Sequence, residues 1–352
     1  MEADSCIHVP RTRGGGAFRH SKDVTLHGND FEWEEKVAEL TSNERTLLDE
    51  YLRKCLAELR LAGPPDVPEE VPTTPWEMHF AASKHHFPLK NYIVHAFPLL
   101  QTILNRPEPT PWVLECGCGT GSTLLPIMRE CTNTKIHFVG FDISSAALSH
   151  FKSNEIAQGY LQRNQLKLFP LAIGSCSSTA DADPIAPALK RQRTDEQTTL
   201  VVDALASLDK SLENQSFDAI LLVFVLSALP TVEKMVLAIK QLKKALKQDG
   251  VLFFRDYALP DHNFFRFLSK LDNKIESVAF AKGDSTTQVF FHKQFATELF
   301  ASAGLVEVED PASKLTYHCN RIVNRKNGKK MDKIFINGTF KLGPGSEAAQ
   351  NS

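Results

Sequence analysis

The stretch VLECGCGTGSTLLPI, from Val113 to Ile127, holds three glycines and two cysteines directly after an apolar run. Gly117, Gly119 and Gly121 remove side chains from a turn where a ligand must approach the backbone. In an open parallel sheet, the turn after the first strand is the usual place for a nucleotide-like ligand to bind. This turn therefore predicts a ligand site, and it indicates the fold.

The spacing of the glycines separates the possible ligands. It is G-x-G-x-G rather than the G-x-G-x-x-G of a dinucleotide fingerprint, and no Gly-Lys-Ser/Thr follows, which excludes a P-loop. Glu115 precedes the turn, where a carboxylate would repel pyrophosphate but suits an ammonium group. Asp142 ends the next apolar run, FVGFDIS, where an acid accepts hydrogen bonds from ribose hydroxyls. We therefore favour S-adenosylmethionine over a nicotinamide cofactor.

The two cysteines of the turn raise a metal site as an alternative. A structural zinc site would need a second Cys or His pair at matching spacing, and none follows Cys116 and Cys118. We interpret both as small side chains that fill a crowded turn, and expect no metal.

Apolar runs alternate with helical stretches from Trp112 onward. PWVLEC, KIHFVGFDI, FDAILLVFV and GVLFFRDY are separated by segments such as TVEKMVLAIKQLKKALKQ. This alternation predicts right-handed crossovers and a doubly wound, mainly parallel sheet. The expected fold class is α/β, of the Rossmann-like class I methyltransferase type, with an N-terminal helical extension.

Composition divides the chain into segments. We expect disorder in residues 1–30, a helical extension with a Pro-rich linker in 31–75, a methyltransferase domain in 76–342 that carries a disordered insertion at 174–198, and a tail in 343–352.

Charge and cysteine content limit the functional classes. The net charge of −2 excludes nucleic-acid binding by bulk charge alone. Between Lys314 and Lys341, however, the chain has eight basic residues and only one acidic residue. This excess of positive charge is typical of a surface that binds a phosphate backbone, but it is equally typical of a solvated hairpin. Seven scattered cysteines in 352 residues favour a reducing compartment, and we expect the cytoplasm. The basic KRQR of the insertion leaves the nucleus open, whereas Glu2 and Asp4 count against a mitochondrial address in the basic amino-terminal segment. No apolar run is long enough to indicate a membrane partner.

Several blocks, in order over residues 75–342, resemble the tRNA 3-methylcytidine methyltransferases. FDAILLVFVLSALP resembles their LIFVLSA strand, and GVLFFRDYALPD resembles their Leu-Phe-Arg-Asp-Tyr element. GDSTTQVFF is similar to their D-G-T-R-x-Y-F-F segment, and PWEMHF and FPLKNYIVHAFP to their Trp-x-x-x-Tyr and F-x-x-R-N-W elements. The resemblance implies methylation of cytidine N3 at position 32 of the tRNA anticodon loop.

The same resemblance implies roles for individual residues. The implied cofactor-binding residues, beside Glu115 and Gly119 of the motif, are Trp76, Phe80, Gly117, Asp142, Asp203, Ala204 and Val223. Asp203 is expected to end the strand whose acid meets the adenine, with KLFPLAI (167–173) as the competing strand. The expected substrate-binding residues are Lys90 and Tyr257, in the elements that carry the resemblance, and Arg325, Lys326, Lys329 and Lys330, in the basic stretch.

Arg255 and Asp256 are the implied catalytic pair. They follow the apolar stem VLFF, so they are expected at the carboxyl end of a strand, where ligands bind. The target base must leave its stack to expose N3, and Asp256 is expected to stabilise the charge that develops on the ring. A structural ion pair is the alternative for these two residues.

Four substitutions depart from the family pattern: Phe80 for Tyr, Lys90 for Arg, Tyr92 for Trp and Thr287 for Arg. They leave two alternatives open: a methyltransferase of protein or small molecules, and an inactive RNA-binding scaffold. The implied partner is the tRNA anticodon stem-loop, and an aminoacyl-tRNA synthetase or other tRNA-binding protein is a further possible partner.

Overall fold

The computed structural model describes residues 19–23, 29–63, 74–82, 87–174, 201–323 and 328–344. Most of the amino-terminal segment and of the insertion expected to be disordered lies outside these ranges. So do most of the Pro-rich linker, Arg325, Lys326 and the residues after 344.

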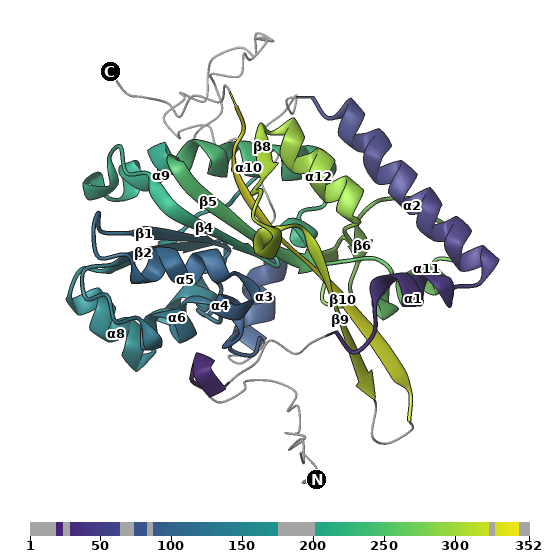
Figure 1. Ribbon diagram of the computed structural model, residues 1–352, viewed down its shortest axis with the longest axis horizontal. Coiled ribbons are helices and arrows are strands. Elements are labelled where there is room, and N and C mark those ends of the chain that lie inside the picture. Colours follow the sequence, from purple (N-terminus) through teal and green to yellow (C-terminus); the bar gives the residue numbers. More distant parts are fainter. Residues whose placement is uncertain are drawn as a thin grey trace.

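One central sheet organises the molecule (Figure 1). Its strand order is β3-β2-β1-β4-β5-β10-β8, with β9 paired to β10. The first five strands are parallel, and β10 joins β5 in the antiparallel sense, with Phe335 opposite Tyr257. The strands are β1 (Trp112–Cys116), β2 (His137–Asp142), β3 (Leu166–Pro170), β4 (Phe217–Val223), β5 (Leu246–Tyr257), β8 (Leu305–Glu307), β9 (Thr316–Val323) and β10 (Lys330–Leu342). The predicted doubly wound, mainly parallel sheet is confirmed.

Helices cover both faces of this sheet (Figure 1). On one face lie α9 (Val201–Leu208), α10 (Val232–Ala245) and α12 (Lys293–Ser302), and on the other α4 (Ile93–Ala96), α5 (Pro98–Asn105), α6 (Leu124–Glu130) and α8 (Glu155–Gln162). Strand β4 is buried along its whole length, which explains its continuous apolar sequence. None of the helices in the described ranges combines the length and apolar character that crossing a membrane requires.

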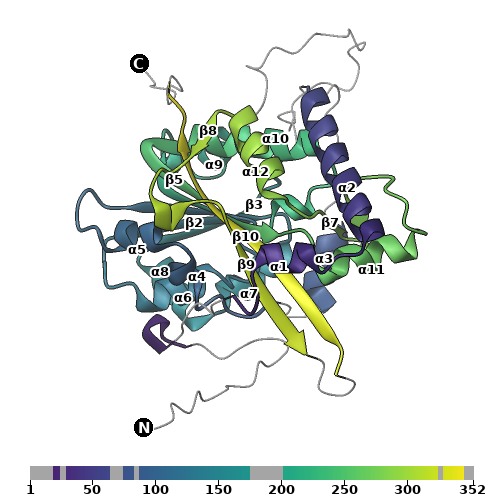
Figure 2. The same cartoon turned by 45° about the vertical axis from the view of Figure 1, so that its right-hand side comes forward.

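The predicted amino-terminal helical segment forms α1 (Trp33–Ala38) and α2 (Ser42–Leu61). A capping box of Thr41 and Glu44 begins α2. Figure 2 shows α2 beside α10 and α12, and its Tyr51 ring contacts Phe264 of α11 (His262–Lys270). Tyr51 is fully buried there, and its hydroxyl donates to the carbonyl of Val278 at 2.6 Å and accepts the N–H of Phe290 at 3.2 Å. The helix thus shares its apolar core with the sheet.

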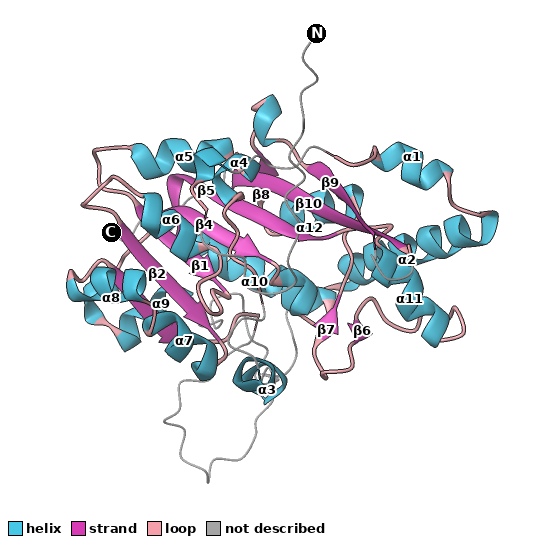
Figure 3. Ribbon diagram, turned by 90° about the horizontal axis from the view of Figure 1, so that it is seen from below, coloured by secondary structure: helices cyan, strands magenta, loops and turns pink. Residues whose placement is uncertain are grey.

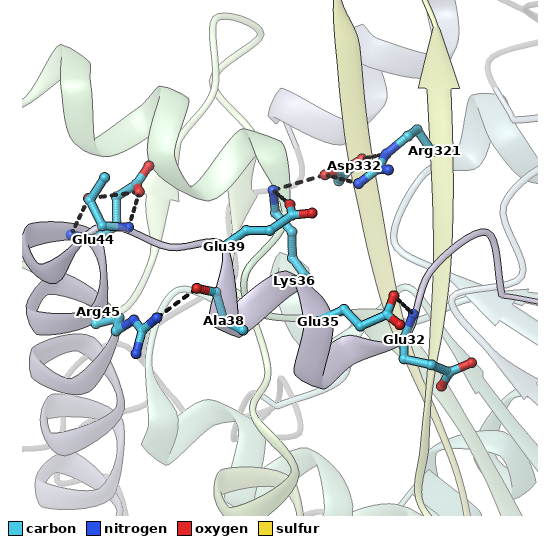
Figure 4. Close-up of polar contacts among 10 residues, drawn as sticks. Glu32, Glu35, Lys36, Ala38, Glu39, Glu44, Arg45, Arg321 and Asp332 are labelled. Carbon is cyan, nitrogen blue, oxygen red and sulfur yellow. Dashed lines mark hydrogen bonds and ion pairs between the residues drawn. The ribbon is translucent and has the colours of Figure 1, made fainter.

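The β9–β10 hairpin extends away from the rest of the sheet (Figure 1). Its outer edge is covered by the segment before α1, because the Asp30 N–H donates to the Cys319 carbonyl at 2.9 Å and an Asp30 oxygen accepts the Arg321 N–H at 2.6 Å. Figure 4 shows Asp332 of β10 between Lys36 of α1, at 2.9 Å, and Arg321 of β9, at 2.7 Å. The amino-terminal segment therefore braces the hairpin.

Candidate cofactor site

A cavity lies at the carboxyl ends of β1, β2 and β4. The glycine turn forms its floor, and the segments after β3 and β4 form one wall. Its lining residues are Trp76, Phe80, Phe87, Lys90, Glu115, Gly117, Cys118, Gly119, Thr120, Ser122, Phe141, Asp142, Ile143, Leu171, Ile173, Val223, Phe224, Val225, Ala228 and Leu229.

The glycine turn leaves the cavity open by lacking side chains. Gly119 has φ +52°, and a Cβ there would stand 3.3 Å from the Phe80 ring and 4.0 Å from an Asp142 oxygen. Gly117 has φ +64°, and a Cβ there would meet Val225 at 2.5 Å. Both positions need glycine for backbone conformation as well as for space. Cys116 and Cys118 are buried within the turn, and no group of three metal-ligating side chains occurs in the described ranges.

Asp142 ends β2 and is fixed by the turn. One of its carboxylate oxygens accepts the Gly119 N–H at 2.8 Å and the other accepts the Ser144 N–H at 2.9 Å. Burial raises the pKa of this carboxyl, and the two N–H donors oppose the rise. Each oxygen keeps a free lone-pair direction, so the carboxylate can still accept from ribose hydroxyls.

Helix α3 (Thr74–Ala82) brings Trp76 and Phe80 to the cavity, beyond the strand ends (Figure 3). Glu77 of the same helix accepts the Ser144 hydroxyl at 2.7 Å at the start of α7 (Ser145–Lys152). On the other side, His79 Nδ1 lies 2.9 Å from an Asp284 oxygen in the turn between β6 (Phe280–Ala281) and β7 (Thr287–Gln288). These contacts hold the aromatic side chains over the turn.

Lys90 and Glu115 place opposite charges deep in the cavity. Only 9% of Lys90 and 2% of Glu115 are exposed. Lys90 Nζ donates to the Ser122 hydroxyl, whereas Glu115 Oε2 has no hydrogen-bond partner among the described residues. Burial raises the pKa of Glu115 and lowers that of Lys90, while the attraction between the two charges opposes both shifts.

The adenine-side prediction needs a correction. Asp203 and Ala204 lie in helix α9 and do not line the cavity, so they do not end the expected strand. The competing segment forms edge strand β3, parallel to β2, and Leu171 and Ile173 after it line the cavity beside Val223. The signal of this strand in the sequence was the alternation of Leu166 and Leu168 with the polar Lys167, and both leucines are buried in the structure.

Asp256 lies near the carboxyl end of β5, as the sequence predicts, but the role expected for it at the ligand needs a correction. Its side chain is fully buried and does not line the cavity. One oxygen accepts the Ser227 N–H at 3.0 Å, in the short helix η4 (Leu226–Ala228), and the other accepts the Tyr257 N–H at 2.9 Å. Because η4 contributes Ala228 to the cavity wall, Asp256 shapes the wall without reaching the cavity.

Arg255 lies on the opposite side of β5 and is 2% exposed. Its guanidinium donates to Asn337 Oδ1 and, at 3.1 Å, to His318 Nδ1 on the hairpin strands. Three aromatic rings surround it, with the guanidinium carbon 4.6 to 5.9 Å from their centroids: Phe335, Tyr92 and Phe224. Like Asp256, Arg255 does not line the cavity. No ion pair joins the two residues among those that the structure describes.

Phe224 is a site residue that the sequence reasoning missed. It follows β4 with φ +61°, an uncommon conformation for a bulky side chain, and it lines the cavity. Its ring lies 4.9 Å from that of Tyr257. Tyr257 itself does not line the cavity but contacts its inner wall through Phe224.

The remaining predicted substrate residues lie elsewhere. Lys329 and Lys330 are exposed at the start of β10, whereas Arg325 and Lys326 fall outside the described residues. Thr287, which replaces the family arginine, donates its hydroxyl to the Ala228 carbonyl at 2.7 Å. It therefore ties β7 to the cavity wall.

Fold and site together define an S-adenosylmethionine-dependent methyltransferase. Gly119 leaves room for the cofactor, Glu115 keeps an unpaired oxygen for its ammonium group, and Asp142 suits its ribose. A family model described as a methyltransferase domain matches residues 90–310, more than half of the chain. The chain belongs to this methyltransferase domain family.

The alignments to curated relatives extend over most of this chain. The rat tRNA N(3)-cytidine methyltransferase METTL6 is 27% identical over 76% of this chain and 79% of its own length. The tRNA N(3)-methylcytidine methyltransferase trm140 of Schizosaccharomyces pombe is 25% identical over 83% of each chain. O-methyltransferase 3 of Dictyostelium discoideum is 30% identical over 72% of this chain, which spans about half (48%) of that protein.

Among solved structures, an Anabaena variabilis S-adenosylmethionine-dependent methyltransferase is 14% identical. It aligns over 80% of this chain and 98% of its own length, with a TM-score of 0.48.

Proposed function

We propose that this protein methylates N3 of a cytidine in tRNA, at position 32 of the anticodon loop. The observation that carries the proposal is the match to relatives named tRNA N(3)-cytidine methyltransferases, which extends over three quarters or more of this chain. One such relative, from Saccharomyces cerevisiae, is named for cytosine 32 of tRNA(Thr). The exposed lysines of the β9–β10 hairpin suit a phosphate backbone.

The inner wall of the cavity suits an extruded base. The Phe224 ring lies 4.9 Å from Tyr257 and 5.7 Å from Phe335, so an aromatic surface adjoins the glycine turn. Bases taken out of a stack bind to such surfaces by stacking. This arrangement supports a nucleobase as the methyl acceptor.

The chain's own residues have a limited chemical task. S-adenosylmethionine, when bound, supplies an electrophilic methyl group, and cytosine N3 carries a lone pair, so no general base is required. Trp76 and Phe80 cover the turn and exclude water, while Phe224 orients the acceptor base. Asp256 holds η4 in place, and Arg255 holds Phe224 and Tyr92 against the hairpin strands. We assign both as positioning residues.

A second candidate is O-methylation of a small molecule. The observation that favours it is the 30% identity to O-methyltransferase 3, although that match covers only half of the relative. An O-methyltransferase would need a group that accepts the hydroxyl proton of its substrate. Among the described residues that line the cavity there is no histidine, and the two carboxylates, Glu115 and Asp142, are the groups assigned to the cofactor.

The test is methyl transfer from S-adenosylmethionine to unmodified tRNA, with the nucleosides identified by mass spectrometry. We expect 3-methylcytidine from the wild type, and none from Asp142→Ala, which loses the acceptor for the ribose hydroxyls. Binding of S-adenosylhomocysteine to the wild type, measured by its thermal stabilisation, shows that the cofactor site is intact. Cofactor binding without any methylated tRNA nucleoside would contradict the proposed substrate, and a tRNA-binding partner added to the reaction checks whether one is needed.

A further inference from the structure

The two buried charges of the cavity are separated rather than paired. Lys90 Nζ donates one hydrogen bond, to a hydroxyl, and Glu115 Oε2 has no hydrogen-bond partner. No ion pair between the two residues is found in the part of the chain that the structure describes. Burying a charge without its counter-charge is costly. Buried charges of this kind cluster at functional sites, where a ligand can complete them.

The surroundings of Lys90 favour an anionic ligand. Its backbone N–H donates to the Ser122 carbonyl at 2.7 Å and its ammonium to the Ser122 hydroxyl, so both ends are fixed to the segment that follows the glycine turn. Burial and the Arg255 charge both lower the pKa of Lys90, and an anion beside it would relieve both effects. The ammonium also lies 5.8 Å from the Phe224 ring centroid. Lys90 thus lies between the turn and the inner wall.

The combination of one positive and one negative side chain matches one part of the cofactor. The methionine end of S-adenosylmethionine carries an ammonium and a carboxylate on the same carbon. We propose that Lys90 binds this carboxylate while Glu115 binds the ammonium, so that the two residues together select the zwitterion. The inference rests on the cofactor in the proposed function, and it replaces the expected contact between Lys90 and RNA.

The experiment compares two ligands that differ only in the carboxylate: S-adenosylmethionine and its decarboxylated analogue. Both keep the sulfonium, adenosine and ammonium groups. Binding of each is measured by titration calorimetry to the full-length wild type and to Lys90→Met, Lys90→Arg and Glu115→Gln. The readout is the ratio of the two dissociation constants within each variant, which does not depend on turnover.

We expect the wild type to prefer S-adenosylmethionine by roughly 10- to 100-fold, the value of a charge-assisted hydrogen bond. Lys90→Met should abolish this preference, because only the carboxylate loses its partner. Lys90→Arg should retain most of it. Glu115→Gln should weaken both ligands and keep the preference, because both carry the ammonium.

Three outcomes would overturn the inference. They are equal loss of both ligands in Lys90→Met, unchanged binding of both, and a wild type without preference. If Lys90→Met does not fold, Ser122→Ala provides the second measurement, since it frees the ammonium and should reduce the preference without removing the charge. Failure of the wild type to bind either ligand would instead contradict the proposed cofactor, so the two failures are distinguishable.

Discussion

At the scale of the residue, Asp256 is a buried carboxyl group that shapes the site without contacting a ligand. Its two oxygens accept two backbone N–H groups, from Ser227 and Tyr257. Asparagine has only one acceptor oxygen, so Asp256→Asn would turn an amide NH₂ toward one of these donors. We expect this variant to lose about 1–3 kcal/mol of unfolding free energy. Urea unfolding of the wild type and the variant at pH 8, where the carboxyl is ionised, measures it, and equal stability would contradict the assignment.

The same carboxyl predicts a dependence of stability on pH. Burial raises the pKa of Asp256 from its ordinary value of 3.8 to about 7 in the folded protein. Between these two values the folded state binds more protons than the unfolded state, so the contribution of Asp256 is full below pH 4 and is lost as the pH rises through 7. Asp256→Asn should therefore be more destabilising at pH 5 than at pH 8. A constant difference between the two proteins would show that Asp256 is ionised throughout.

The residues of the glycine turn could be predicted from sequence because their spacing itself carries the chemistry. Gly119 and Asp142 lie at the cavity, where the motif places them. The position of Asp256 could not be predicted in the same way. A charged residue at the end of a strand can contact either a ligand or a backbone N–H group. The sequence does not distinguish the two cases here, because the short helix η4, which provides the Ser227 N–H, has no recognisable sequence pattern.

At the scale of the element, the β9–β10 hairpin carries both ion-paired and exposed basic residues near its turn. Asp332 holds Lys36 and Arg321 there, so neither side chain is free for phosphate (Figure 4). Lys329 and Lys330, at the same end of the hairpin, are exposed. Of the basic residues that the sequence groups together, only some are therefore available to a partner.

Reversing the charge of Lys329 and Lys330, together with Arg325 and Lys326, should weaken tRNA binding. The salt dependence should also become shallower, by about one unit of slope for each phosphate that the protein no longer neutralises. The matched control reverses four exposed lysines outside the hairpin, Lys240 and Lys244 on α10 together with Lys270 and Lys274. Filter binding across a salt series measures both. If control and hairpin variants bind tRNA alike, the hairpin is only a solvated surface.

The edge strand β3 shows why one element escaped prediction. Its sequence, LKLFP, is short and half exposed, and the spacing back from β4 favoured the apolar residues of α9 instead. Residues 175–200 lie outside the described ranges, so sequence distance there says little about position in the sheet. Pairing with β2, through Phe141 and Phe169, is a long-range contact that no local pattern reports.

At the scale of the whole molecule, the amino-terminal helices belong to the same core as the sheet. Phe31 and Leu40 lie in the apolar cluster that contains Phe254 of β5. Tyr51 of α2 packs against the Phe264 ring at 5.0 Å and reaches the backbone on both sides of β6 and β7. Because β7 is tied to the cavity wall through Thr287, the amino-terminal helices support the cofactor site through a continuous chain of contacts.

This continuity predicts a single unfolding transition. Tyr51→Phe would leave the Phe290 N–H and the Val278 carbonyl buried without their partner, at a cost of about 1–3 kcal/mol for the whole molecule. Thermal unfolding followed by far-ultraviolet circular dichroism and by aromatic fluorescence should give one coincident, lowered midpoint. Tyr160→Phe is the matched control, since its hydroxyl donates only to the Met128 carbonyl, at 2.8 Å, and should cost less. An early, separate transition in Tyr51→Phe, with the main midpoint unchanged, would show instead that α1 and α2 unfold independently of the methyltransferase sheet.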